Sequence, residues 1–361
     1  MTRLLLVGGG TAGHINPMLA VAHEAIRQAE SRPDEILIVG SKNGMEEKLV
    51  PQAGIALSTL PRLPLPRKIS FASVSFIPRF LIAILRGLWI LRSHQPDVVA
   101  GFGGYVSAPI YIAAWIARVP IVIHEANAIP GFANRLGARL TSHVATTFSL
   151  TKLSRSRQIG MPVRRSLSHP DVEPNKISAR NYFGLSRRKK TLLVIGGSQG
   201  AAKINSTLEK VVPVLTRSGW QVLHIVGPKN PLPNLENSSY VALSYCERMD
   251  LAFASATAVI SRAGSATVAE IGVFGVPAIF VPYPVGNGEQ EKNALELCRS
   301  GAAVLVSDSD FTPEYFHSSV MPLLGDSEAL RKMRRMFKGM AHVDAAFDFV
   351  CMIREAGKGR K

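Results

Sequence analysis

The sequence predicts an α/β protein built from two doubly wound, Rossmann-like domains with a deep cleft between them. Three observations support this fold class. The chain has 361 residues with 47% hydrophobic content, a size at which one core usually divides into two. Short apolar runs alternate with amphipathic helical stretches, as in parallel βαβ units. The alternation begins a second time near residue 191, which indicates a second domain of the same kind.

The strands of both sheets are predicted from short β-branched runs that are separated by segments of helical periodicity. In the first domain we expect strands at residues 4–7, 35–39, 96–100 and 120–124. In the second domain we expect strands at residues 191–195, 221–226, 258–260 and 277–281.

A polar stretch marks the boundary between the domains. Residues 159–164 lead into a segment rich in Ser, Asn, Arg and Pro that runs to about residue 181, a composition typical of a linker. We therefore expect one domain at residues 1–163 and another at residues 164–340. Residues 344–355 have a helical pattern, and we expect residues 341–361, this helix and a basic tail, to pack back toward the first domain.

The charge of the chain favours anionic partners. Lys and Arg number 42 against 26 Asp and Glu, a net charge of +16. Nucleic acid, anionic lipid and phosphorylated substrates all fit such a surplus. No nucleic-acid-binding module is recognisable, so we expect no nucleic-acid partner.

The cysteines and the N-terminus predict the compartment. Cys246, Cys298 and Cys351 are far apart and lack the spacing of metal ligands, which favours a reducing compartment without disulfide or zinc. Met1 leads directly into an apolar strand and a run of glycines rather than into a signal peptide, so we expect the chain to stay in the cytoplasm.

One apolar stretch, residues 69–91, approaches the length of a membrane span. Pro78, Arg79 and Arg86 interrupt it, so we do not expect it to cross a bilayer. Its aromatic and aliphatic residues interleave with Arg67, Lys68 and the other arginines, a mixture suited to an anionic lipid interface. The alternative is an ordinary helix that packs its apolar face on the sheet.

Glycine-rich loops follow the first strand of each domain. Residues 8–14 and residues 196–200 both lie between a strand and a helix, where free backbone N–H groups and the helix dipole attract anions. The alternatives are a dinucleotide-binding domain or merely a tight turn. Neither loop has the full dinucleotide spacing, and no acidic residue ends the second strand of either domain.

A third turn, residues 261–270, also joins a strand to a helix. It places Gly264, Ser265 and Thr267 at the helix start, where amides and hydroxyls hold a diphosphate. Glu270 lies further along the helix, where a carboxylate suits two ribose hydroxyls because it accepts twice. The alternative for Glu270 is a solvated helix residue.

These loops belong to a set of motifs that extends over nearly the whole chain in a specific order. They are Gly-Gly-Thr-Ala-Gly-His at 9–14, Gly-Gly-Tyr-Val-Ser at 103–107, His-Glu-Ala-Asn at 124–127, Gly-Gly-Ser-Gln-Gly at 196–200 and the segment 262–270. In them the sequence resembles the MurG family of bacterial peptidoglycan N-acetylglucosaminyltransferases, which have the two-domain GT-B fold. The resemblance implies transfer of GlcNAc from UDP-GlcNAc to undecaprenyl-pyrophosphoryl-MurNAc-pentapeptide (lipid I), forming lipid II, without a cofactor.

The resemblance also implies where the substrates bind. The domain at 164–340 is expected to bind UDP-GlcNAc, and the domain at 1–163 the acceptor and the membrane. The donor residues it implies are Arg164, Ser198, Cys246, Ser265, Ala266, Thr267, Val268, Ala269, Glu270, Gln290 and Asn293. From the first domain it implies Thr11, Ala12, Gly13 and Asn127 toward the donor, and Tyr105, His124, Glu125 and Asn134 around the acceptor.

Transfer to a hydroxyl requires a base and a means of stabilising the departing diphosphate. Helix N-termini and Arg164 supply positive potential without metal, and no Asp-x-Asp motif follows a strand, so we expect no metal. His14 is the first candidate base because it lies beside the glycine loop and titrates near neutrality. A structural imidazole is the alternative for His14, and His124 with Glu125 is the alternative pair. Direct displacement by one hydroxyl would invert the anomeric centre.

Other functions remain open from the residues alone. A UDP-GlcNAc 2-epimerase would share the architecture and the donor, and a non-catalytic sugar-nucleotide-binding scaffold would need no base. The expected partners of the transferase are UDP-GlcNAc, lipid I, an anionic membrane surface and other cell-wall and division proteins. We expect it at the cytoplasmic side of the cell membrane, as a peripheral protein.

Overall fold

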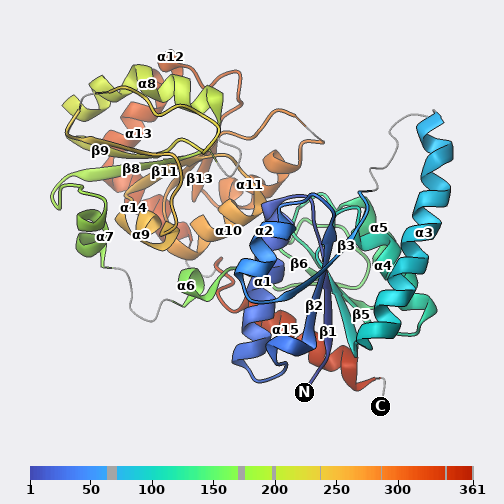
Figure 1. Cartoon of the computed structure of the whole chain (residues 1–361). Coiled ribbons are helices and arrows are strands. Elements are labelled where there is room, and N and C mark those ends of the chain that lie inside the picture. The colour runs from blue at the N-terminus through green and yellow to red at the C-terminus, as the bar shows by residue number, and fades with distance from the viewer. Residues whose placement is uncertain are drawn as a thin grey trace. The chain divides into compact units, whose positions relative to one another are not determined.

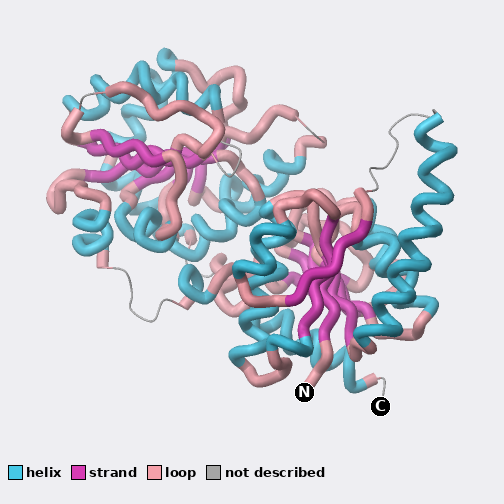
Figure 2. The backbone as a smooth tube through the Cα atoms, in the orientation of Figure 1, coloured by secondary structure: helices cyan, strands magenta, loops and turns pink. Residues whose placement is uncertain are grey.

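The computed structural model describes residues 1–62, 71–169, 175–196, 201–235, 237–285, 287–337 and 340–359. Two compact units are present: Met1–Arg165 with His342–Lys361, and Ser166–Ala341. Each unit contains one sheet flanked by helices (Figures 1 and 2). All strand pairs in both sheets are parallel, so the predicted α/β class with two Rossmann-like domains is confirmed.

The first sheet has the strand order β3-β2-β1-β4-β5-β6-β7. Its strands are β1 (Leu4–Val7), β2 (Ile36–Ser41), β3 (Ala56–Leu60), β4 (Val98–Gly101), β5 (Ile121–Glu125), β6 (His143–Thr146) and β7 (Ser156–Gln158). The helices of the first unit are α1 (Ala12–Arg27), the 3₁₀ turn η1 (Pro33–Glu35), α2 (Glu46–Gln52), α3 (Phe71–His94), α4 (Ser107–Ile116), α5 (Phe132–Gly137) and, from the C-terminal segment, α15 (Ala345–Lys358). Helix α6 (Arg165–Ser168) begins at the boundary between the two units.

The second sheet has the order β10-β9-β8-β11-β12-β13. Its strands are β8 (Lys190–Ile195), β9 (Trp220–Ile225), β10 (Tyr240–Leu243), β11 (Ala258–Ser261), β12 (Ala278–Phe280) and β13 (Ala303–Leu305). Its helices are α7 (Lys176–Tyr182), α8 (Ala202–Arg217), α9 (Met249–Ser255), α10 (Ser265–Phe274), α11 (Glu289–Arg299), α12 (Pro313–Tyr315), the π-helical turn η2 (Phe316–Val320), α13 (Met321–Gly325) and α14 (Ser327–Met336).

Alternate residues of the central strands face opposite layers, because successive side chains of a strand point to opposite faces. In the first unit Leu4 and Leu6 pack against α1, α2 and α15. Leu5 and Val7 pack against α3, α4 and α5. The strands are therefore buried on both faces, as a parallel sheet requires.

Helix α15 closes one face of the first sheet. Its Phe349 is fully buried, with ring centroids 5.3 Å from Phe102 and 5.6 Å from His124. Figure 1 shows this helix, in red, beside α1. The helix predicted at residues 344–355 is present at Ala345–Lys358, while Arg360 and Lys361 of the basic tail lie outside the described residues.

Helix α3 packs on α4 and leaves an apolar row exposed. A Cβ on Gly87 would lie 3.0 Å from Ala113 Cβ, so the two helices approach closely there. Its outer side exposes Ile77, Leu81, Leu85 and Trp89, which recur every fourth residue. No helix in the described part of the chain is long and apolar enough to cross a membrane. Arg67 and Lys68 lie outside the described residues.

Candidate active site

His14 lies in the first turn of α1, directly after the glycine loop. Its Nδ1 lies 3.0 Å from the carbonyl oxygen of Gly9 and 3.3 Å from Thr11 Oγ1. Since a carbonyl oxygen only accepts, the shorter contact assigns the proton to Nδ1. In the neutral ring Nε2 then keeps a lone pair that can accept a proton.

The surroundings of His14 favour its neutral form. Burial lowers the pKa of the imidazole below its usual 6.5, because a charged ring is poorly solvated there. The hydrogen bond to Gly9 and the charge of Glu46 oppose that shift. An imidazole that is neutral near pH 7 suits a general base.

Glu46, the first residue of α2, lies beneath the glycine loop. The side chain is fully buried, and its Oε1 accepts hydrogen bonds from the backbone N–H groups of Gly10 at 2.9 Å and Ser41 at 3.3 Å. The Gly10 amide is therefore bound to a carboxylate of the chain itself. The anion binding that was expected of the first glycine loop is therefore not available at the Gly10 amide, which already binds Glu46.

The residues after Gly10 stay predictions as ligand contacts. Thr11 is exposed and Gly13 half-buried at the start of α1. Thr11 makes no side-chain cap of that helix, so the first-turn amides receive no cap from it. The side chain of Ala12 lies outside the described residues.

His124 lies at the end of β5, inside the core. Its Nε2 donates to the carbonyl oxygen of Gly160 at 2.8 Å, and its ring is fully buried between Phe102 and Phe349. Burial lowers the pKa of His124 to about 4. A ring enclosed in this way cannot reach a substrate hydroxyl, which removes His124 from the alternative base pair.

Glu125 holds the loop between β5 and α5. Its Oε1 accepts from the backbone N–H of Asn127 at 2.9 Å. Its Oε2 accepts from the Gly131 amide at 3.0 Å and from Asn134 Nδ2 at 2.9 Å. The buried carboxylate of Glu125 therefore holds the loop in its conformation rather than accepting a proton from the substrate.

Asn134 is also buried and fully engaged. Its Nδ2 donates to the His124 carbonyl at 3.1 Å as well as to Glu125, and its Oδ1 accepts from Tyr111 Oη at 2.9 Å. Asn127 is half-buried, and Tyr105 is 48% exposed. Of the expected acceptor residues, Tyr105 is thus the one that reaches the surface, and Asn127, which was expected toward the donor, is also partly accessible.

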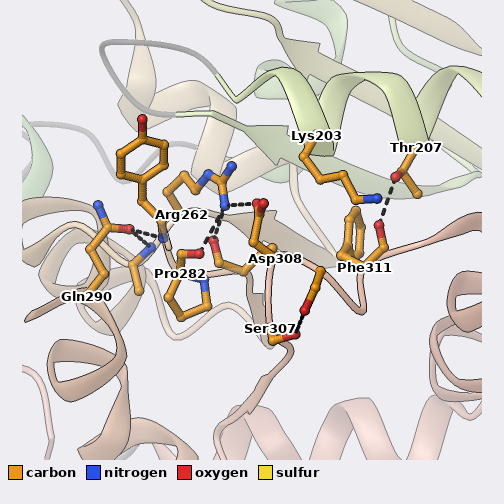
Figure 3. A network of polar contacts seen from close by, with 12 residues as sticks. Lys203, Thr207, Arg262, Pro282, Gln290, Ser307, Asp308 and Phe311 are labelled. Atoms are coloured by element: carbon orange, nitrogen blue, oxygen red, sulfur yellow. Dashed lines mark hydrogen bonds and ion pairs between the residues drawn. The ribbon is translucent and has the colours of Figure 1, made fainter. Parts of the chain in front are cut away.

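In the second unit, Arg262 and Asp308 fix the turn after β11 (Figure 3). Arg262 Nη1 donates to Asp308 Oδ1 at 2.5 Å and to the carbonyl oxygens of Val281 at 3.0 Å and Pro282 at 3.1 Å. The guanidinium lies over the ring of Tyr283, 5.4 Å from its centroid. The Arg262 side chain is 8% exposed, so this ion pair is largely buried.

Gln290 and Asn293 hold the same turn from α11. Gln290 Oε1 accepts from the backbone N–H groups of Ala263 at 3.2 Å and Tyr283 at 2.9 Å (Figure 3). Asn293 is fully buried, and its Nδ2 donates to the Ala263 carbonyl at 3.3 Å. The structure thus brings both residues to the turn that precedes α10, in a supporting position.

The N-terminus of α10 has no side-chain cap. Its N-cap is Gly264, which supplies no side-chain hydrogen bond, so the amides of Ser265, Ala266 and Thr267 receive no cap from it. Val268 is buried, whereas Ala269 and Glu270 are half-buried. Any contact from Val268 to a ligand must come from its backbone.

The remaining predicted donor residues are dispersed. Cys246 is buried after β10, and burial raises the pKa of its thiol. Arg164 is exposed in the first unit. Ser198 and its glycine loop at 197–200 lie outside the described residues.

Three residues that shape these sites were not predicted from the sequence. Glu46 lies five residues beyond the end of β2, where no motif marks it, and Tyr111 is one of several large residues in an apolar helix. Asp308 follows β13, a strand too short to be predicted. Only their hydrogen bonds reveal them. Within the described residues, no group of three or more His, Cys, Asp or Glu is arranged to hold a metal ion.

Two parallel-sheet units, one with an imidazole beside a glycine loop and one with an uncapped helix N-terminus, are consistent with a two-domain glycosyltransferase, and two family models show this class. The N-terminal domain of glycosyltransferase family 28 matches residues 4–146, and the C-terminal domain of that family matches residues 191–348.

Curated relatives define the family more closely. A UDP-N-acetylglucosamine–N-acetylmuramyl-(pentapeptide) pyrophosphoryl-undecaprenol N-acetylglucosamine transferase of Clavibacter sepedonicus is 43% identical, covering 100% of this chain and 98% of that protein. The protein of that name from Streptomyces coelicolor is 43% identical over 98% of each. The crystal structure of Acinetobacter baumannii MurG matches with a TM-score of 0.78 and 25% identity, covering 98% of this chain and 100% of that one. The chain belongs to this MurG family of glycosyltransferases.

Proposed function

We propose that this chain transfers GlcNAc from UDP-GlcNAc to the muramyl pentapeptide of lipid I, forming lipid II, with inversion at the anomeric carbon and without a metal ion. The observation that carries this proposal is the 43% identity to transferases of that name over the full length of the chain. A His14 imidazole held neutral, with Nε2 as acceptor, supplies the base that such a reaction needs.

The reaction is a single displacement. The acceptor hydroxyl oxygen bonds to the anomeric carbon while the bond from that carbon to the diphosphate oxygen breaks. The hydroxyl proton goes to His14 Nε2, and UDP leaves with the electron pair of the broken bond. Attack from the face opposite the leaving group turns an α-linked donor into a β-linked product.

The second unit is proposed to hold the donor. The amides of Ser265, Ala266 and Thr267 face the diphosphate at the N-terminus of α10, where negative charge is favoured. Glu270 accepts from the ribose hydroxyls. Gln290 contacts the sugar and, together with Asn293, holds the turn before α10, while Val268 and Ala269 are further proposed donor contacts. Arg164, Ser198 and the backbone at Cys246 complete the proposed donor site.

The first unit is proposed to hold the acceptor. Tyr105 contacts it directly, because it reaches the surface, and Asn127 extends toward the donor. Glu125 and Asn134 position Asn127 by hydrogen bonds within the loop that follows β5. Thr11, Ala12 and Gly13 present the start of α1 to the donor.

Helix α3 is proposed to lie on anionic lipid at the inner face of the cell membrane. Its exposed apolar row, Ile77, Leu81, Leu85 and Trp89, is accompanied by the exposed Arg79, Arg86 and Arg92. Apolar side chains beside cations suit the boundary between headgroups and acyl chains. A lipid-linked acceptor requires the enzyme to work at that surface, where other cell-wall and division proteins are further proposed partners.

Mass spectrometry, with proton nuclear magnetic resonance for the anomeric linkage and for the epimer, tests the function with UDP-GlcNAc and a short-chain analogue of lipid I. The expected product is heavier by one GlcNAc, carries a β linkage and forms at the same rate in excess EDTA. Donor incubated alone should remain unchanged, whereas formation of the manno epimer would identify an epimerase. If neither incubation gives a product, the result would indicate a non-catalytic binding protein.

A further inference from the structure

We propose that Glu46 is a positioning residue for His14, acting through the Gly9–Gly10 peptide group that lies between them. This inference rests on the proposed function, in which His14 is the base. Nothing in the sequence motifs or in the comparisons assigns Glu46 a role.

One peptide group joins the two side chains. The carbonyl of Gly9 accepts from His14 Nδ1 at 3.0 Å, and the N–H of Gly10, in the same peptide group, donates to Glu46 Oε1 at 2.9 Å. The C=O and N–H of a trans peptide point in opposite directions, and the described chain has no cis peptide. The carboxylate and the imidazole are therefore bound at opposite ends of one polarisable group.

The surroundings of Glu46 are shaped to admit a carboxylate. A Cβ on Gly9 would lie 2.0 Å from Glu46 Oε1, and one on Gly44 would lie 1.9 Å from Oε2. A Cβ on Gly40 would lie 2.9 Å from the Glu46 Cβ and Cγ atoms. Three glycines thus leave the space that this side chain fills. Gly10 itself has a φ of +93°, a conformation that only glycine adopts readily and that turns its N–H toward Glu46.

The carboxylate is buried without full compensation. Oε2 of Glu46 is inaccessible to solvent and has no hydrogen-bond partner within the described residues. A buried acceptor without a hydrogen-bond partner destabilises a fold. Such a group therefore calls for an explanation, and a functional role is one. We assign the carboxylate an electrostatic purpose. The negative charge of Glu46, bound to the Gly10 N–H, polarises the peptide group and makes the Gly9 carbonyl a stronger acceptor for the Nδ1–H of His14.

Two consequences for His14 follow. The stronger carbonyl fixes the Nδ1–H tautomer and so keeps Nε2 as the proton acceptor. It also stabilises the imidazolium that forms when His14 takes the acceptor proton, as a carboxylate does in a direct pair with histidine. The titratable groups that act on His14 are Glu46 and, from β5, His124, which is neutral at physiological pH.

The test uses the full-length protein with Glu46→Gln, which keeps the size and the Oε1 acceptor but removes the charge. Its matched control is Glu47→Gln, the exposed neighbour whose carboxylate accepts from the Asn43 amide instead. Nuclear magnetic resonance of ¹⁵N-labelled histidine, with His14 assigned by its loss in His14→Gln, gives the tautomer and the titration of the ring. Transferase assays across pH give kcat and the KM for UDP-GlcNAc.

In Glu46→Gln we expect a lower imidazole pKa for His14 and a kcat about 10-fold lower, the scale seen when a partner behind a functional residue is lost. The donor KM should stay within about twofold, since Glu46 is fully buried and is not among the proposed donor contacts. Glu47→Gln should match the wild type in each measurement. An unchanged His14 titration and kcat in folded Glu46→Gln would overturn the proposal.

The wild-type protein supplies a second criterion that does not depend on whether the variant folds. Its His14 ring should show the Nδ1–H tautomer near pH 7.5, and an Nε2–H tautomer would overturn the proposal. Because the tautomer and titration are measured without substrate, they remain informative if the protein proves not to transfer GlcNAc.

Discussion

At His14, a single ring nitrogen decides what the side chain can do. The Gly9 carbonyl engages Nδ1, so the remaining nitrogen is the one that accepts a proton. Burial lowers the pKa of the ring below 6.5, which keeps it unprotonated at neutral pH. The residue thus combines a fixed tautomer with the correct protonation state, both of which a general base requires.

Substitution His14→Ala should lower kcat about 100-fold or more, the usual effect of removing a general base. The KM for UDP-GlcNAc should change little, because His14 is not among the proposed donor contacts. Steady-state kinetics with both substrates measures this. Turnover close to that of the wild type would exclude His14 as the base.

The sequence motifs identified candidate site residues but not their hydrogen bonds. The motif at 9–14 identified His14, and the motif at 124–127 identified Glu125. Neither motif shows that His124 turns into the core while Glu125 binds Asn134, because both outcomes are compatible with a polar pair at a strand end. Glu46 escaped notice because its partner, the Gly10 amide, is 36 residues away in sequence.

Among the elements, α3 presents apolar side chains to solvent although it already packs on α4. Substitution Leu85→Glu places a charge in the middle of the exposed row. In the proposed complex the Leu85 side chain is buried in lipid, and burying one leucine contributes about 1.5–3 kcal/mol. Its loss should therefore weaken binding to anionic vesicles by about 10-fold or more. Co-sedimentation with anionic and neutral liposomes measures the effect.

The control for α3 is Ile177→Glu, an exposed apolar residue on α7 of the second unit, which should bind as the wild type does. Equal binding of Leu85→Glu and wild type would refute the assignment of this face to lipid. So would wild-type binding that shows no preference for anionic over neutral vesicles.

The turn between β11 and α10 depends on the Arg262–Asp308 ion pair. Asp308→Ala would leave the buried guanidinium without its counter-charge, and breaking such pairs costs about 3–5 kcal/mol. Hydrogen exchange of β11 and β12 in increasing urea reports this loss within the second unit. Asp310→Ala, at an exposed neighbour, is the control, and equal protection in both variants would contradict the prediction.

The strands that were predicted correctly are those whose side chains are almost entirely buried. The eight predicted strands occur in the structure as β1, β2, β4, β5, β8, β9, β11 and β12, which lie at the sheet centres or next to them. The strands that were missed, β3, β6, β7, β10 and β13, lie at or near the sheet margins. Strand β7, Ser156–Gln158, has no apolar residue, so only its pairing with β6 defines it.

In the molecule as a whole, each unit buries a neutral histidine. Burial lowers the pKa of His124 in the first unit to about 4, and that of His224 in the second unit to about 4. Unfolded histidine titrates near 6.5, so between these values the unfolded chain binds protons that the folded chain excludes. Stability should therefore be complete above pH 6.5 and fall toward pH 4, by at most about 1.4 kcal/mol per pH unit for each ring.

His224→Gln tests this for the second unit. In the folded chain Tyr240 Oη lies 2.8 Å from His224 Nδ1, and Asn205 Oδ1 lies 3.0 Å from Nε2, a pair of contacts that a glutamine amide can replace without ionising. Urea unfolding between pH 4 and 7 should show a shallower acid loss than in the wild type. His23→Gln, at an exposed position, should leave the pH dependence unchanged, and identical slopes in all three proteins would contradict the argument.

The packing of α15 on β4, β5 and β6 has a consequence for synthesis. The last strand of the first sheet is complete at Gln158, yet the helix that covers these strands begins at Ala345, after the whole second unit. At about 5–20 residues per second, a ribosome needs roughly 10–40 s to translate the intervening segment. For that interval the apolar surface that receives Phe349 is bare on the nascent chain, where a chaperone would have to shield it from aggregation.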